Sequence, residues 1–361
     1  MKELLTIAES PDAAHAFAAN SVALATGARW MGGEVYRQVA VRQLAVPGDA
    51  WARQVDAIEQ AFAPLYDTEE YANAGLQMLN AAEFTMLASA VGQPSPLNEA
   101  GSPAVQTQPN NPPRWLDIGC GTGRIALYAA QIARLTAVDQ TAGYVQATAQ
   151  KLQRVPQLAA PPQLVVAPVE RLLASETTQK YNIATAMFGV LNHCQDWQNV
   201  VGGVAKALQP GGTFALSMYG SPEAAVYQEL ARGMAYQPAI LTRRTAGGLL
   251  LGEGAGQVLP AQFPYPAEIT DVLALSGLAP TQLVPFLGVT ALYPRQPSQG
   301  NRAEYLKTIQ RRYGSDIAAT LRAYNGDAAQ LLVASLYADY QLGSDRVNEA
   351  AYVGVAARKD A

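Results

Sequence analysis

The segment most suggestive of chemistry runs from Leu116 to Gly123 and reads LDIGCGTG. An acid near the end of a short apolar run is followed by glycines at alternating positions, and a helical pattern begins directly after them. Glycine permits a tight turn and lets the backbone approach a ligand closely. The helix that follows offers free N–H groups and the positive end of its dipole. The pattern therefore predicts a ligand site at the carboxyl end of a strand.

Two classes of cofactor use such a turn, and one of them fits poorly. A dinucleotide site requires Gly or Ala at the third position of G-x-G-x-x-G. Counted from Gly119 and Gly121, that position holds Arg124. A large charged side chain there would obstruct close packing of helix on strand, so the dinucleotide fingerprint fails. Asp117, two residues before the first glycine, is also no part of it.

The elements that must position this turn alternate regularly over about one hundred residues. Short apolar runs predict strands and 3.6-residue periodicity predicts helices. The predicted strands are 115–118, 135–138, 164–167, 181–187 and 213–218, and the predicted helices are 123–133, 142–154 and 197–208. Repeated strand–helix units favour a parallel sheet with right-handed crossovers and helices on both faces.

The flanking regions predict additions to this core. Residues 1–91 have mostly helical spacing and are expected to form an N-terminal helical cap region, whereas 92–113 is a Pro-, Gly- and Asn-rich linker. The core is expected to span 114–361, with 221–262 and 295–345 as cap insertions. Our hypothesis is that the N-terminal region and the second insertion form a lid that encloses the acceptor and excludes water.

Several motifs follow one another in a familiar order: LDIGCGTG, then Asp139 after the second strand, VVAPVERL, ATAMFGVLNHC and ALQPGG. With them the chain resembles the class I S-adenosylmethionine-dependent methyltransferase family over roughly residues 113–220. The resemblance implies a seven-stranded doubly wound α/β sheet of order 3-2-1-4-5-7-6 with strand 7 antiparallel. Strands 6 and 7 are then expected at about 284–292 and 350–357, with the helical insertion between them.

The resemblance also implies roles for individual residues. Asp117 would help position the methionine amino group of S-adenosylmethionine, and Asp139 would accept both ribose hydroxyls. A charged hydrogen bond of that kind contributes about 1.5–3 kcal/mol. The other residues expected to line the cofactor are Gly119, Cys120, Gly121, Gln140, Val169, Glu170 and Phe188. Many relatives carry an Asp where this chain has Pro168, so a backbone amide or Glu170 would replace that contact to adenine.

Each assignment has a structural alternative. Asp117 also suits a simple cap of the turn, Cys120 a small turn residue rather than a nucleophile, and Glu170 a solvated charge. His193 follows the fourth strand, where this fold places the acceptor, and a neutral imidazole there can remove a proton from a hydroxyl or amine. Loop packing is its alternative role. Tyr219 is a candidate substrate contact or a structural residue.

Composition excludes several classes of protein. With 49% hydrophobic and only 15% charged residues, the 361-residue chain is globular rather than disordered. The net charge of −4 lacks the basic excess of a nucleic-acid-binding protein, and residues 1–110 alone carry 12 Asp or Glu against five Lys or Arg. Two cysteines, no signal-peptide pattern and no long apolar run predict a cytoplasmic protein without a membrane span.

The predicted function is therefore methyl transfer from S-adenosylmethionine to a small-molecule oxygen or nitrogen by direct displacement, with no metal site. A protein side-chain methyltransferase, a non-catalytic S-adenosylmethionine-binding protein and a nicotinamide-dependent oxidoreductase are the alternatives. A pocket of Tyr66, Tyr71 and Tyr227 is one hypothesis for the acceptor, against ordinary packing of tyrosines between helices. The acceptor and the oligomeric state stay open at this point.

Overall fold

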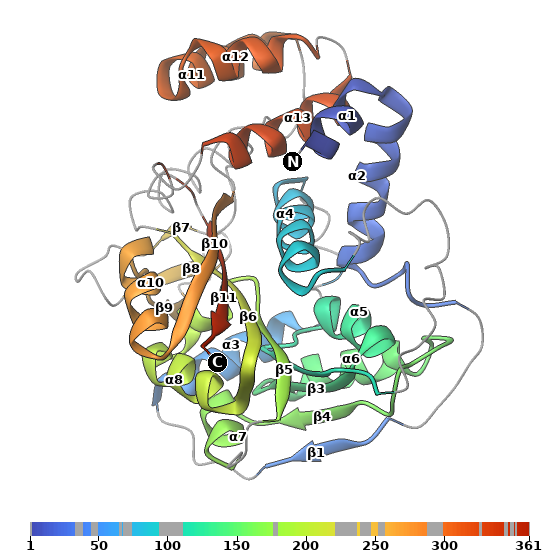
Figure 1. The fold of residues 1–361 in the computed structure, drawn as a ribbon, viewed down its shortest axis with the longest axis vertical. Helices are drawn as coiled ribbons and strands as arrows, with labels where there is room; N and C mark the ends of the chain where they lie inside the picture. The colour runs from blue at the N-terminus through green and yellow to red at the C-terminus, as the bar shows by residue number, and fades with distance from the viewer. Residues whose placement is uncertain are drawn as a thin grey trace.

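The structure, a computed structural model, describes residues 2–32, 39–44, 50–64, 67, 74–93, 111–175, 180–220, 237–238, 247–251, 257–286, 299–324, 327–342, 346, 350 and 352–360. Its centre is an eight-stranded sheet of order β1-β4-β3-β2-β5-β6-β11-β10 (Figure 1). These strands are β1 (Val41–Gln43), β2 (Arg114–Ile118), β3 (Arg134–Asp139), β4 (Gln163–Val166), β5 (Tyr181–Ala186), β6 (Leu208–Tyr219), β10 (Leu278–Phe286) and β11 (Tyr352–Lys359).

The expected α/β fold is present, with one correction to the sheet. Seven strands follow the predicted order, and β11 runs antiparallel to both β6 and β10. The eighth strand, β1, pairs in parallel with β4 and comes from a region for which only helices were predicted. All three of its residues are exposed, so it has no buried face and no alternating pattern that sequence analysis could detect. The strand predicted at about 284–292 in fact begins at Leu278.

Alternate strand residues supply two separate cores. On one face, Trp115 and Ala137 pack with α4 (Ala74–Val91), α5 (Arg124–Ile132) and α6 (Ala142–Leu152). On the other face, Leu116 and Val138 pack with α7 (Val169–Ser175), α8 (Trp197–Ala207) and α10 (Pro266–Leu275). Because the inner strands β2, β3 and β4 are covered on both faces, they are buried almost throughout, as expected for a parallel sheet.

A smaller antiparallel sheet lies apart from the first. It is made of β7 (Gln237–Pro238), β8 (Gly247–Leu251) and β9 (Gln257–Ala261), and β8 pairs antiparallel with both β7 and β9. Most of the predicted linker 92–113 and of the insertion 221–262 lies outside the described residues, as do Tyr66, Tyr71 and Tyr227.

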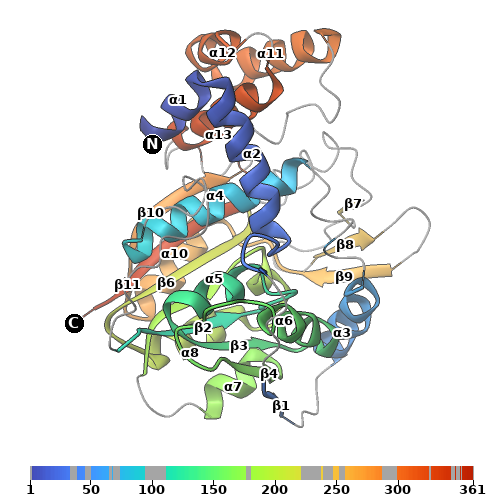
Figure 2. The ribbon, with the colours of Figure 1, turned by 90° about the vertical axis from the view of Figure 1, so that its right-hand side faces the viewer.

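Helices from the two ends of the sequence lie side by side (Figures 1 and 2). Three of them, α1 (Lys2–Glu9), α2 (Pro11–Ala25) and α13 (Ala328–Gln341), pack together above α4, and α11 (Gln299–Tyr313) and α12 (Ser315–Arg322) lie beyond α13. His15 Nε2 lies 2.8 Å from Asp327 Oδ2, and Gln330 Nε2 donates to the Ala8 carbonyl at 2.8 Å. The helix α3 (Ala50–Phe62) lies elsewhere, beside α6 and β9 (Figure 2).

Candidate cofactor and acceptor site

The glycine turn between β2 and α5 has the left-handed backbone that its sequence predicts. Gly119 has φ +64° and Gly121 has φ +50°. A Cβ atom on Gly119 would lie 2.3 Å from Val190 Cγ2, whereas one on Gly121 would meet no atom within 4 Å. The first glycine is therefore required for packing. The second borders open space that a ligand can fill.

Asp117 places an unsatisfied carboxylate oxygen beside this turn. Its Oδ1 accepts a 2.8 Å hydrogen bond from Thr185 Oγ1, whose own acceptor function is used by Trp115 Nε1 at 2.9 Å. Its Oδ2 is buried and has no hydrogen-bond partner among the described residues. Burial raises the pKa of Asp117 to about 7. A buried polar atom without a partner is costly, so this oxygen is suited to a positively charged ligand group.

Asp139 lies at the end of the neighbouring strand β3 and faces the same turn. One carboxylate oxygen accepts from the Gly121 amide at 3.0 Å and the other from the Thr141 amide at 2.9 Å. Burial raises its pKa to about 6, with the Asp56 charge adding to the rise. Each carboxylate oxygen has two lone pairs, so both oxygens retain capacity for hydroxyl donors. The residues present thus fit an adenosyl cofactor that carries an ammonium group and a ribose.

The remaining predicted cofactor residues lie around these two acids. Gln140 follows Asp139 directly, and the Ala167 amide at the end of β4 donates to the Asp139 carbonyl at 2.9 Å. Val169 is buried at the start of α7, and the adjacent Glu170 is exposed. Cys120 is buried, and desolvation holds its pKa well above the ordinary value, which favours a turn residue over a nucleophile.

Phe188 closes the end of β5 in an unusual conformation. It has φ +65° and is the one non-glycine residue with positive φ in the described part of the chain. Gly189, with φ +75°, follows it and leads into the short 3-10 helix η2 (Val190–His193). Bulky residues rarely adopt this region, and they persist there only when the surroundings hold them.

The structure brings His193 and Tyr219, the two candidate acceptor residues, into contact. Their rings make an edge-to-face contact with centroids 5.9 Å apart. Tyr219 also contacts Phe263 and Tyr352, and Tyr352 contacts Phe188. His193 Nδ1 lies 2.8 Å from the Pro260 carbonyl, and burial lowers the pKa of the ring. The ring is therefore neutral, with its hydrogen on Nδ1, because a carbonyl can only accept.

The helix α3 contributes groups that sequence analysis missed. Trp51 Nε1 donates to the His193 carbonyl at 2.7 Å, so the start of α3 is bound to the acceptor loop. Near its end, Glu59 Oε2 accepts from the Tyr144 hydroxyl at 2.5 Å, and Gln60 Oε1 accepts from the Gly143 amide at 3.2 Å. This helix thus joins the loop after β5 to the first turn of α6, on the side of Asp139.

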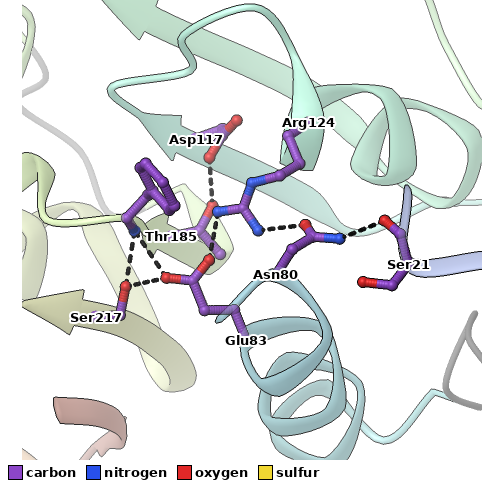
Figure 3. A network of polar contacts seen from close by, with 8 residues as sticks. Ser21, Asn80, Glu83, Asp117, Arg124, Thr185 and Ser217 are labelled. Atoms are coloured by element: carbon purple, nitrogen blue, oxygen red, sulfur yellow. Dashed lines mark hydrogen bonds and ion pairs between the residues drawn. The ribbon is translucent and has the colours of Figure 1, made fainter. Parts of the chain in front are cut away.

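The helix α4 contributes a buried ion pair that was also missed (Figure 3). Glu83 is fully buried and forms an ion pair with Arg124, the first residue of α5. The other arm of Arg124 donates to Asn80 Oδ1 at 2.8 Å. Arg124 therefore packs against α4, where its size is accommodated. The signal in the sequence was Glu83, the one charged residue of a mainly apolar helical stretch, with Asn80 about one turn before it.

No group of three or more His, Cys, Asp or Glu among the described residues is arranged to hold a metal ion. Within the same residues, no helix is both long and apolar enough to cross a membrane.

One comparison with known proteins identifies the class of a domain in this chain. Residues 116–216 match the family model of a methyltransferase domain. No curated protein matches the chain. Among solved structures, the Burkholderia thailandensis 1,6-didemethyltoxoflavin-N1-methyltransferase with bound S-adenosylhomocysteine is 14% identical (TM-score 0.43), with coverage of 88% of this chain and 94% of that chain.

Two further solved structures are similar at the same level. The [4+2]-cyclase SpnF is 16% identical (TM-score 0.43), with coverage of 90% of this chain and 98% of that chain. The CcbJ methyltransferase from Streptomyces caelestis is 18% identical (TM-score 0.39), with coverage of 69% of this chain and 84% of that chain. These superpositions are too loose to transfer residue roles. The match shows that residues 116–216 form a methyltransferase domain, which supports an enzyme that uses S-adenosylmethionine.

Proposed function

We propose that the enzyme methylates a hydroxyl or amine of a small molecule, by direct displacement at the methyl carbon. S-adenosylmethionine, when bound, supplies a methyl group that its positive sulfur already activates. The protein then has to orient the acceptor and receive its proton. The observation that carries this proposal is the half-buried, neutral imidazole of His193 with its Nδ1 directed at the Pro260 carbonyl.

His193 suits the role of general base because the Pro260 carbonyl and burial together fix its protonation state. The Pro260 carbonyl holds the hydrogen on Nδ1, so Nε2 carries the lone pair that can accept a proton from the acceptor. Burial keeps the ring neutral at physiological pH. Proton removal by a positioned side chain typically contributes about 10²–10⁴-fold to the rate.

The surroundings of His193 favour an aromatic or largely apolar acceptor. Tyr219, Phe263 and Tyr352 form a continuous set of ring contacts at the ends of β6, β9 and β11. Such rings bind flat apolar surfaces, and a tyrosine hydroxyl adds a polar contact that fixes orientation. The bond from Trp51 to the His193 carbonyl places α3 over this loop, which favours an acceptor small enough to be enclosed.

For the cofactor we propose that Asp117 Oδ2 accepts from the methionine ammonium group and that Asp139 accepts from the ribose hydroxyls. The first assignment rests on the unsatisfied buried oxygen, and the second on the spare lone pairs beside Gly121. Backbone of Gly119, Cys120, Gly121 and Gln140 would line the cofactor, with Val169, Glu170 and Phe188 at its edges.

The domain organisation remains part of the proposal. Residues 1–91 would act as a cap region, 92–113 as a linker and 114–361 as the core, with 221–262 and 295–345 as insertions. Within the second insertion, α13 packs against α1, α2 and α4, and α12 packs against α13. A lid formed from these parts predicts slower proteolysis at 295–345 when S-adenosylhomocysteine and acceptor are bound. Equal cleavage with and without them would contradict it.

The test is an acceptor screen with S-adenosylmethionine and small aromatic alcohols, phenols and amines, followed by mass spectrometry of S-adenosylhomocysteine and methylated product. With an active acceptor, His193→Ala should lower kcat by about 10²–10⁴-fold while the Kd for S-adenosylhomocysteine stays unchanged. His15→Ala is the matched control, because this second histidine lies on α2 and contacts Asp327 instead. It should leave kcat unchanged.

Other outcomes would overturn the proposal. Methyl transfer to added proteins, with no small-molecule acceptor found, would assign protein side chains as the substrate. Binding of S-adenosylmethionine without any turnover would assign a binding function. Binding of NADH in place of S-adenosylhomocysteine would contradict the cofactor itself. Unchanged kcat in His193→Ala would remove that residue from proton transfer.

A further inference from the structure

The turn at Phe188 is clamped from outside the methyltransferase core. The Phe188 amide donates to Glu83 Oε1 at 2.9 Å and to Ser217 Oγ at 2.7 Å. The Ser217 hydroxyl in turn donates to the same Glu83 oxygen. Glu83 belongs to α4, and Ser217 to β6, so the turn after β5 is held from a helix and from the neighbouring strand at once (Figure 3).

The clamp is itself rigidly anchored. The second oxygen of Glu83 pairs with one terminal nitrogen of Arg124. The other terminal nitrogen of Arg124 donates to Asn80, which lies on α4 like Glu83. Asn80 Nδ2 then donates to the Ser21 carbonyl at 2.9 Å, which ties the network to α2. Glu83 and Ser217 have no exposed surface and Arg124 has 5%. A buried network whose members are all satisfied specifies one geometry.

The clamped turn lies next to the acid with the unsatisfied oxygen. Strands β2 and β5 are neighbours, and Asp117 is in register with Thr185, which donates to it. Thr185 precedes Phe188 by three residues on the same chain segment. Any change in the backbone at Phe188 is therefore transmitted to the cofactor site beside Asp117 over a short, stiff path.

We propose that Glu83 is a positioning residue: from the N-terminal helix α4 it holds the left-handed turn at Phe188 and thereby shapes the cofactor site beside Asp117. Phe188 has no intrinsic preference for φ +65°. The carboxylate supplies the acceptor that makes this conformation the best one available to its amide. The Phe188 ring is held by the same network, since it lies over the Arg124 guanidinium with the centre 5.5 Å away.

The test measures the Kd for S-adenosylhomocysteine by calorimetry, together with the thermal midpoint. Glu83→Gln keeps the size of the side chain but removes its negative charge and one of its two acceptor oxygens. Arg124 then loses its ion pair, and the side chain has one oxygen left to accept from both Arg124 and the Phe188 amide. We expect the Kd to rise at least roughly tenfold. Thr85→Val is the matched control: Thr85 lies on the same helix, and among the described residues its hydroxyl bonds only to the Ala81 carbonyl, at 2.8 Å. The Kd of this variant should not change.

A second arm separates the clamp from a general effect on folding. Glycine adopts positive φ freely, so a turn carrying Phe188→Gly no longer needs the clamp. In that background the additional effect of Glu83→Gln on the Kd should shrink to less than about threefold. An equal rise in Kd in both backgrounds would overturn the proposal. So would a Glu83→Gln variant that keeps the parental Kd and differs only in its lower melting temperature.

If Glu83→Gln fails to fold, Ser217→Ala takes its place in the same pair of backgrounds. It removes the hydroxyl that bridges the Phe188 amide and Glu83 but leaves no charge unpaired. A rise in Kd with Phe188 present, and a smaller rise with Phe188→Gly, supports the clamp. No rise in either background contradicts it. Because the readout is cofactor binding, this result is independent of which acceptor the enzyme uses.

Discussion

Two helices of the N-terminal region, α3 and α4, reach the same site by different means. In α4, Glu83 is completely buried, and donors on Arg124, Ser217 and Phe188 satisfy its carboxylate. In α3, the buried Asp56 Oδ1 has no hydrogen-bond partner in the described part of the chain. Glu59, beside it on α3, bonds to the Tyr144 hydroxyl, and burial raises its pKa to about 7.

The difference indicates which helix is a fixed part of the site. Removing one partner of a satisfied buried ion pair is strongly destabilising, so Glu83 and Arg124 hold α4 firmly against the core. A carboxylate with a raised pKa opposes burial whenever it ionises, so the contact of α3 with α6 weakens as the pH rises. Three substitutions test this contrast.

The largest effect is expected from Arg124→Met, which breaks the α4 side. It leaves Glu83 buried without its cation, and that should cost about 3–5 kcal/mol of unfolding free energy. Urea unfolding measures the loss. Arg311→Met is the matched control, because Arg311 pairs with Glu304 at 3.3 Å and its side chain is 71% exposed. That exposed pair should cost less than about 1 kcal/mol. Similar losses for both variants would contradict the contrast.

An intermediate effect is expected from Glu59→Gln on the α3 side. Desolvation raises the pKa of Glu59 from 4.5 to about 7, with a hydrogen bond from Tyr144 lowering it and the Asp139 charge raising it. Its contribution to stability is therefore fully present below about pH 4.5 and is lost as the pH rises through 7. Because Gln resembles the protonated acid, Glu59→Gln should melt at least about 2 °C above the parent at pH 8.

The same variant should match the parent near pH 4.5. Glu9→Gln is the control, since Glu9 is exposed at the end of α1, and its melting profile should follow the parent at every pH. A constant offset between Glu59→Gln and the parent across the pH range would show that ionisation of Glu59 does not govern the hold of α3.

The smallest effect is expected from Trp51→Phe, which sharpens the comparison at the other end of α3. It removes the 2.7 Å bond from Trp51 Nε1 to the His193 carbonyl. A lost hydrogen bond of this kind costs about 0.5–1.5 kcal/mol. Urea unfolding gives the stability change. With an acceptor in hand, KM for that acceptor should rise while the Kd for S-adenosylhomocysteine stays the same, because only the acceptor loop is loosened.

Much of the core could be predicted because its signals are local. A few neighbouring residues are enough to predict each of three elements: the strand ending at Ile118, the glycine turn and the helix that begins at Arg124. Asp117 and Asp139 could be paired because parallel strands bring their carboxyl ends to one edge. The short edge strand β1 could not be predicted, because its three exposed residues show no alternation of apolar and polar side chains.

The residues missed at the site share a different property. Glu83 lies 41 positions before Arg124 and 105 before Phe188, and Pro260 lies 67 after His193. No spacing rule connects residues so far apart. A single charged residue, Glu83, in a mainly apolar helix was visible in the sequence, but its partners were not.

The sequence by itself determined the parallel sheet, the glycine turn and the acids at its edge, because hydrophobic periodicity and turn chemistry act over a few residues. The tertiary structure alone decided that Arg124 belongs to a clamp on Phe188 and that the proton of His193 lies on Nδ1. Such facts depend on which groups meet after burial. A carboxylate or an imidazole takes its charge, its hydrogen and its role from neighbours that only the folded chain supplies.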